Sequence, residues 1–90
     1  MNPFDLLFHE DAILAFRKIR GENRKALRQF FDLLPDNPYL RSDSNYEDKK
    51  GRIVSKMRIR QYVVDYQVDD PLKEIKVLEI NRIVRTKRPS

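Results

Sequence analysis

The sequence contains no cysteine, one histidine and only two glycines. Without cysteine the chain cannot form a disulfide scaffold, a thiolate metal site or a cysteine nucleophile. The single histidine, His9, excludes a centre with several histidine ligands, and a serine–histidine–aspartate triad would have to use it. Two glycines are too few for a glycine-rich phosphate loop. We therefore expect no metal and no cofactor, and we interpret His9 as a helix-capping or surface residue.

Long apolar runs are also missing. The longest uninterrupted run is Ala12–Phe16, far short of the ~20 residues that a membrane-spanning helix needs. No lysine or arginine precedes Phe16, and acids interrupt the apolar residues of this segment, which is unlike an export signal. The pattern indicates a soluble, cytoplasmic protein with no membrane partner.

The chain is rich in charged residues. Of its 90 residues 37% are charged and 40% are hydrophobic, and the net charge is +5. The apolar share is sufficient for one compact core, so we interpret residues 1–90 as a single domain. The basic balance favours a polyanionic partner.

Apolar spacing predicts a short strand and two helices in the first half. Pro3–Phe8 is an apolar run with one acid, which suits an edge strand. A helix is expected to begin at Glu10 and to end at Gly21. Its buried stripe is Ala12, Ile13, Phe16 and Ile19. A second stripe is formed by Ala26, Leu27, Phe30, Phe31, Leu33 and Leu34. Because the connection is short, the two helices are expected to form an antiparallel hairpin.

The second half changes to a period of two, which predicts antiparallel strands. Tyr39–Lys50 has no period and is interpreted as a surface loop. Strands are expected at residues 52–60, 62–68 and 74–84. Alternation slips between Val77 and Leu78, which indicates a bulge or burial on both faces. The predicted fold is α+β, with a short N-terminal strand and a two-helix antiparallel hairpin packed on an antiparallel sheet of three to four strands. The residues expected to be mostly buried between helices and sheet are Leu27, Phe30, Phe31, Ile53, Met57, Ile59, Val64 and Val68.

Six cations and no acid occupy residues 49–60. Strand alternation places Lys56, Arg58 and Arg60 on the face away from the helices, about 6–7 Å apart, which is close to the phosphate spacing of a nucleic acid. Further cations close the chain, and a nearby tyrosine offers a stacking surface for bases. The candidate nucleic-acid-binding residues are Arg52, Lys56, Arg58, Arg60, Tyr62, Arg82 and Arg85. The alternative is an ordinary solvated sheet surface, although such surfaces mix both signs of charge.

A second basic cluster lies on the predicted helices and includes a single acid, Glu22. Its cations are Arg17, Lys18, Arg20, Arg24, Lys25 and Arg28. We interpret it as an exposed helical face, with a partner-docking surface as the alternative. Asp65 and Glu79 lie in predicted strands beside apolar residues. We interpret them as ion-pair partners of the cations rather than as a general acid–base pair.

The order of elements and three segments resemble the RelE/ParE toxin superfamily of bacterial toxin–antitoxin systems over nearly the whole chain. The segment LLFHEDAILAFRKI is similar to the family's apolar strand, polar pair and alanine-led helix. The segment SKMRIRQYVVDYQVDD resembles its basic alternating strand, turn and tyrosine-containing strand that ends in acids. The segment IKVLEINR resembles its closing strand before a basic residue.

This resemblance implies one of two activities. RelE-like members cut messenger RNA in the ribosomal A site with basic residues and no metal, whereas ParE-like members inhibit DNA gyrase and cut nothing. In both branches an antitoxin wraps and neutralises the toxin. The resemblance thus implies a toxin that cleaves ribosome-bound mRNA and binds a cognate antitoxin. The alternatives are a gyrase-binding toxin and a degenerate, inactive toxin that only binds its antitoxin.

The family's site residues transfer to this sequence in part. Lys56 and Arg58 match two alternating basic positions of the ribonuclease branch. The family's arginine after the tyrosine of the next strand falls on Val63, and Arg60 across the turn is the candidate to compensate. The arginine at the end of the last strand falls on Arg82 or on the residue after it, and the tail IVRTKRPS lacks the family's tyrosine or histidine. The implied catalytic residues are Lys56, Arg58, Arg60 and Arg82, with Lys56 as proton acceptor and the arginines on the phosphate.

Overall fold

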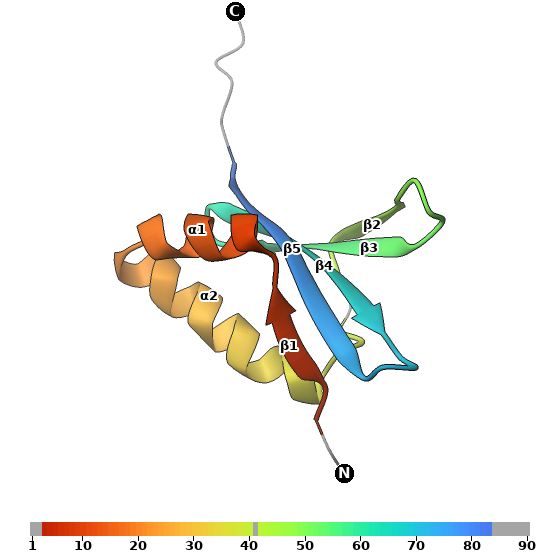
Figure 1. Cartoon of the computed structure of the whole chain (residues 1–90). Coiled ribbons are helices and arrows are strands. Elements are labelled where there is room, and N and C mark those ends of the chain that lie inside the picture. The colour runs from red at the N-terminus through yellow and green to blue at the C-terminus, as the bar shows by residue number, and fades with distance from the viewer. Residues whose placement is uncertain (1–2, 41, 84–90) are drawn as a thin grey trace, which may run out of the picture.

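The computed structural model describes residues 3–40 and 42–83, which form two helices packed on a five-stranded sheet (Figure 1). The helices are α1 (Glu10–Lys18) and α2 (Gly21–Leu33), followed by a 3₁₀ turn at Leu34–Asp36. The strands are β1 (Asp5–Phe8), β2 (Ser44–Glu47), β3 (Ile53–Ile59), β4 (Tyr62–Asp69) and β5 (Glu74–Arg82). The α+β class, with a short N-terminal strand and two helices before the main strands, is confirmed.

The sheet has the order β1-β5-β4-β3-β2 and is mixed. β1 is parallel to β5, with Leu6 opposite Ile75, and the other three pairs are antiparallel. The prediction of three to four strands missed β2. The predicted surface loop over Tyr39–Lys50 is wrong at its centre, where Ser44–Glu47 pairs with β3. All four residues of β2 are exposed, so the segment has no hydrophobic alternation that would reveal a strand.

The core lies between the helices and the sheet and is rich in aromatic contacts. Phe31 of α2 meets the rings of Phe8 and Phe16 edge-on, at centroid distances of 4.9 and 5.8 Å. Tyr66, on the central strand β4, packs against Phe30 at 5.9 Å. The fully or nearly buried members of this cluster are Ala12, Ile19, Leu27, Phe30, Phe31, Leu34, Val64, Tyr66, Ile75, Val77 and Ile80. Of the other predicted core residues, Met57, Ile59 and Val68 are partly buried against it.

Ile53 does not belong to the core, and its predicted burial is wrong, because its exposed fraction is 55%. In Figure 1 α1 and α2 lie beside β1 and β5, whereas β2 and the start of β3 extend to the other side. Val54, the neighbour of Ile53 in β3, faces the other side of the sheet, pairs with Tyr46 of β2 and is only 1% exposed. Strand alternation therefore placed Ile53 and Val54 correctly on opposite faces of β3. It did not predict that the face of Val54, rather than that of Ile53, is covered at this end of the strand.

Gly21 begins α2, and its expected role in ending the first helix is wrong. α1 stops at Lys18, and Ile19 is extended with φ −86° and ψ 135°. Gly21 has φ 66°, a left-handed conformation that favours glycine, and it lets the chain turn into α2. Arg24 then joins the helices, since its Nη1 donates to the carbonyls of Phe16 and Ile19 at 3.2 and 3.4 Å.

The slip in the alternation of β5 is a register shift, which is the first of the two predicted explanations. Asp65 lies opposite Glu79, but the next residue of β4, Tyr66, lies opposite Val77, so Leu78 is the extra residue. This arrangement keeps Tyr66 and Val77 in the core while Asp65 and Glu79 share the outer face of the sheet.

Candidate nucleic-acid interface

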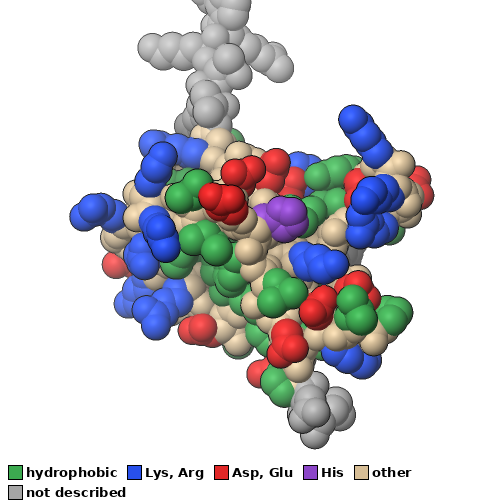
Figure 2. All heavy atoms as spheres, in the orientation of Figure 1, with side chains coloured by type: hydrophobic (Ala, Val, Ile, Leu, Met, Phe, Trp, Pro, Cys, Tyr) green, Lys and Arg blue, Asp and Glu red, His purple; other side chains and the backbone are tan. Residues whose placement is uncertain are grey.

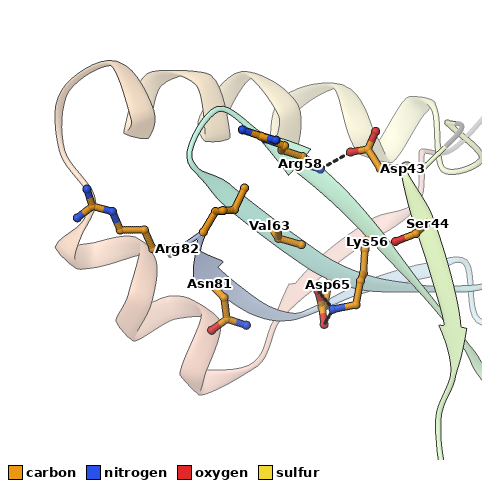
Figure 3. Close-up of a pocket in the computed structure, with 9 residues that line it drawn as sticks. Asp43, Ser44, Lys56, Arg58, Val63, Asp65, Asn81 and Arg82 are labelled. Atoms are coloured by element: carbon orange, nitrogen blue, oxygen red, sulfur yellow. Dashed lines mark hydrogen bonds and ion pairs between the residues drawn. The ribbon is translucent and has the colours of Figure 1, made fainter. Parts of the chain in front are cut away.

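The sheet face turned away from the helices carries an open groove of about 300 Å³ (Figure 3). Val64 and Tyr66 of β4 point into the core, so the alternate residues Val63 and Asp65 point into the groove. The lining residues are Asp43, Ser44, Lys56, Arg58, Val63, Asp65, Asn81, Arg82 and Ile83. The groove thus combines side chains from the start of β2, the middle of β3 and β4, and the end of β5.

Three of the four predicted catalytic residues, Lys56, Arg58 and Arg82, line this groove, and Arg60 does not. Arg60 lies in the turn between β3 and β4 with φ 55°. Its Nε donates to Oδ1 of Asn23 on α2 at 3.1 Å. The prediction that Arg60 shares the outer face with Lys56 and Arg58 is therefore wrong. It rested on strand alternation, which ends where the backbone turns to positive φ.

Lys56 is held by a buried carboxylate. Its Nζ lies 3.3 Å from both carboxylate oxygens of Asp65, which is 3% exposed. The hydroxyl of Tyr46 donates to the same carboxylate at 3.2 Å, and the ammonium lies 5.0 Å from the centre of the Tyr46 ring. The interpretation of Asp65 as an ion-pair partner of the cations is confirmed. An ammonium in contact with a carboxylate acts as a positive charge and a proton donor, which argues against the proton-acceptor role expected for Lys56.

Tyr46 is the site residue that sequence reasoning missed. It lies in β2, within the segment predicted to be a loop, and it reaches across β3 to the carboxylate on β4. Burial raises the pKa of the Tyr46 hydroxyl, and the negative charge of Asp65 raises it further. The hydroxyl therefore remains a hydrogen-bond donor to Asp65 at neutral pH. Its only sequence signal was an aromatic residue in an otherwise polar stretch, which does not by itself indicate a strand.

Arg58 is an exposed cation of the groove. Its backbone N–H donates to Oδ2 of Asp43 at 2.6 Å, and its side-chain Nε donates to the carbonyl of Arg60 at 3.2 Å. The sheet register places Val63 opposite Arg58 and Asn81 opposite Val63. Val63 therefore makes the centre of the row Arg58–Val63–Asn81 apolar, at the position where the family pattern has an arginine.

Arg82 reaches the groove from the end of β5. Its register partner is Tyr62, which packs against the core, so Arg82 starts from the helix side of the sheet. In Figure 3 its side chain extends away from Val63 and Lys56. Arg82 can therefore contact the end of a bound strand rather than the phosphate held by Lys56.

Two further predicted nucleic-acid contacts, Tyr62 and Arg52, do not line the groove. Tyr62 is half-buried against the core on the helix side, so its expected place as a stacking surface beside the cations is wrong. Arg52 lines a separate hollow with Gln67 and Lys76, and its Nε lies 3.6 Å from Asp48. Arg85 lies outside the described residues.

The helical cations form a second basic surface, visible in Figure 2 as lysine and arginine side chains over the helical side of the molecule. Each of Arg17, Lys18, Arg20, Arg24, Lys25 and Arg28 is exposed. The interpretation as an exposed helical face is confirmed. Arg24 also has an internal role, because its guanidinium stacks 4.5 Å from the centre of the Phe16 ring.

Among the described residues no three His, Cys, Asp or Glu side chains come close enough to hold a metal ion. His9 is exposed at the start of α1, and its side chain makes no capping hydrogen bond. Neither helix of residues 3–40 and 42–83 has the length and hydropathy needed to cross a membrane.

This architecture, with two helices on one face of a five-stranded mixed sheet, is the RelE-type toxin fold. The chain superposes on the isolated E. coli RelE toxin with a TM-score of 0.75 and 22% identity, covering 93% of this chain and 88% of that one. It also superposes on the archaeal RelE–RelB complex of Pyrococcus horikoshii with a TM-score of 0.79 and 21% identity, covering 93% and 99%. For the RelBE2 toxin–antitoxin complex of Mycobacterium tuberculosis the TM-score is 0.71 at 21% identity, covering 89% and 98%. No protein-family model matches the sequence, and no curated protein matches it at a significant level. The likeness therefore establishes the fold.

Proposed function

We propose that this protein is the toxin of a bacterial toxin–antitoxin system and that it cleaves ribosome-bound mRNA as a RelE-like endoribonuclease. The observation that carries this proposal is the groove of a RelE-type fold, whose lining includes Lys56 and Arg58 on the outer sheet face and Arg82 at one end. An open groove lined by cations suits a single strand of RNA, whose phosphates it can reach without opening a duplex. Ribosome-bound mRNA would place the protein in the cytoplasm.

The proposed reaction needs no metal and no cofactor. The 2′-oxygen of the RNA bonds to the neighbouring phosphorus while the bond from phosphorus to the 5′-oxygen breaks. The 2′-hydroxyl gives its proton to solvent water, and the Lys56 ammonium gives one to the departing 5′-oxygen and is reprotonated by water. Arg58 holds the phosphate and stabilises the charge of the phosphorane, and Arg82 orients the strand beyond it.

The groove variants test this function directly. Induced expression should arrest growth of a bacterial host, and mRNA in translating extracts should be cut within codons. Arg58→Ala should lower the cleavage rate by about 10²–10³-fold, because one preorganised charge at the phosphorane is lost. Lys56→Gln should have a similar effect, and its amide can still donate to the buried Asp65, so the fold is preserved better than with alanine. Arg82→Ala should have a smaller effect.

Arg28→Ala is the matched control, since it removes an exposed arginine from α2 rather than from the groove. It should leave cleavage unchanged. Equal loss in Arg28→Ala and Arg58→Ala would show that general basicity, and not the groove, accounts for activity.

A second candidate is a ParE-like toxin that binds DNA gyrase and cleaves nothing. Val63 at the centre of the groove, the pairing of Lys56 with Asp65 and the contact of Arg60 with α2 favour it, because each removes charge from the phosphate position. Growth arrest with intact mRNA and inhibited gyrase supercoiling would support this candidate. An absence of growth arrest from a folded protein would support the third candidate, an inactive toxin that only binds its antitoxin.

A cognate antitoxin is the proposed protein partner in all three cases. Two of the structures with this fold are RelE–RelB and RelBE2 complexes, which supports such a partner. Co-expression with the product of a short neighbouring reading frame should relieve growth arrest, and the two proteins should co-purify.

A further inference from the structure

Asp65 is an unusual residue for the floor of a phosphate-binding groove. It lies in the central strand β4, is 3% exposed, and points to the same face as Lys56 and Val63. Glu79 lies opposite it in the sheet register and adds a second carboxylate on that face. A phosphate that reaches Lys56 therefore approaches a fixed negative charge.

The carboxylate of Asp65 cannot swing away from the groove. Its oxygens are bound by the Lys56 ammonium at 3.3 Å and by the Tyr46 hydroxyl at 3.2 Å. A buried charge is screened less by water and salt than an exposed one, so its field acts strongly over the short distance to a ligand of Lys56. The side chain of Lys56 is 39% exposed and so remains open to a ligand on its other side.

Asp43 and Asp65 together offset two of the three cations that line the groove. Their situations differ, because Asp43 is exposed and its carboxylate accepts the backbone N–H of Arg58. Asp65 is the acid in direct contact with a candidate phosphate-binding side chain.

We propose that Asp65 is an internal counter-ion that fixes the Lys56 ammonium on the groove floor and weakens RNA binding by competing with the RNA phosphate. Tyr46 orients this carboxylate through its hydroxyl. The inference rests on the proposed RNA-binding function of the groove and assigns a positioning residue that also limits affinity.

The direction in which one substitution changes RNA affinity separates this role from a structural one. Asp65→Asn keeps the shape of the side chain and removes the charge, so RNA should bind about tenfold more tightly at low salt. Loss of a purely structural residue would weaken binding. Asp65→Val removes the same charge with a side chain that favours a buried strand, and it carries the test if the asparagine variant does not fold.

The probe is a short single-stranded RNA with 2′-O-methyl groups, which cannot be cleaved, titrated over a range of salt concentrations. Asp36→Asn is the matched control, because it changes the net charge equally at an exposed residue of the 3₁₀ turn. Its affinity should stay close to that of the wild type. In a Lys56→Gln background the gain from Asp65→Asn should disappear, since Asp65 acts through Lys56.

Each result has one meaning. Tighter binding by either Asp65 variant, absent in Asp36→Asn and lost in the Lys56→Gln background, supports the counter-ion role. Wild-type binding with unchanged or weaker binding by folded Asp65 variants overturns the inference and leaves the proposed function standing. If Asp65→Asn still tightens RNA binding in the Lys56→Gln background, Asp65 does not act through Lys56 and the inference is overturned. If the wild type binds no RNA at any salt concentration and cuts none, the proposed function fails and this inference with it.

Discussion

Phe30 connects the helical layer of the fold to the sheet. It is 7% exposed and joins Phe31 within α2 to Tyr66 on the central strand, at ring distances of 5.7 and 5.9 Å. Phe30→Ala should lower the free energy of unfolding by about 3–5 kcal/mol, because it removes buried apolar surface and leaves a cavity. That is a large part of the stability of a 90-residue domain. Urea titration followed by circular dichroism would measure the loss.

Leu33→Ala provides the comparison, since Leu33 is on the same helix but 59% exposed. We expect a loss below about 1 kcal/mol for this variant. Similar losses in the two variants would contradict the assignment of the buried face of α2.

Single residues also mark where sequence reasoning succeeded and where it failed. Lys56 and Arg58 could be placed on one face because β3 alternates regularly, and Asp65 could be named as an ion-pair partner. Arg60 could not be placed, because the positive φ of a turn without a favoured turn residue leaves no trace in the hydrophobic pattern. Tyr46 was missed since its site role depends on a strand with no buried residue.

Among the elements, the β2–β3 hairpin is organised by one carboxylate, Asp48. Its Oδ1 accepts the backbone N–H groups of Lys50 and Arg52 at 2.9 Å, and its Oδ2 accepts from Gln67 on β4 at 3.1 Å. Asp48→Ala should loosen the pairing of β2 with β3 and speed amide hydrogen exchange there, while exchange in β5 stays slow. Glu47→Ala removes an acid one residue earlier and should leave the exchange rates unchanged.

The same carboxylate predicts a pH dependence of the hairpin. The pKa of Asp48 lies below its ordinary value, chiefly because the backbone N–H of Arg52 donates to it, with further hydrogen bonds from Lys50 and Gln67. A carboxyl whose pKa is lower in the folded state stabilises the fold fully above its unfolded pKa, about 4, and loses this contribution as the pH falls through the folded pKa. The protection of amides in β2 and β3 against exchange, relative to the intrinsic exchange rate at each pH, should therefore fall below about pH 4 in the wild type. Asp48→Ala should show no such step from this residue.

The elements differ in how visible they are in the sequence. The helices combine a buried and an exposed face, so their period is clear. The period of β3 and β4 is visible because polar and apolar residues alternate along them, although Asp65 and Gln67 of β4 are themselves buried. The parallel pairing of β1 with β5 depends on a partner far along the chain. β2 pairs with its neighbour β3, but all four of its residues are exposed, so no hydrophobic pattern encodes it. The exposure of Ile53 is not encoded locally either, because burial depends on which element covers a face.

At the scale of the whole molecule, the groove and the helices each carry a group of basic residues. Lys25 and Arg28 line a shallow hollow on α2 with Gly21 and Arg24, on an element that contributes nothing to the groove. Because the groove is the proposed RNA site, the double variant Lys25→Gln and Arg28→Gln should leave the salt dependence of log K for single-stranded RNA unchanged, whereas a slope reduced by about 0.7 for each lost contact would show that RNA phosphates also contact the helices. Salt titrations with two unrelated RNA sequences would measure this. An unchanged slope of log K against log salt concentration would leave the groove as the one surface of the described residues that binds RNA phosphates.

The parallel pairing of β1 with β5 also determines when the molecule can finish folding. Asp5 lies opposite Glu74, so residues near one end of the chain must wait for residues near the other. Contacts of such long sequence range slow folding. During synthesis the first strand stays unpaired until β5 has left the ribosomal exit tunnel, and the groove, whose wall includes the end of β5, cannot form earlier. A nascent chain of this protein is therefore without its groove until β5 has been made and has emerged from the ribosome.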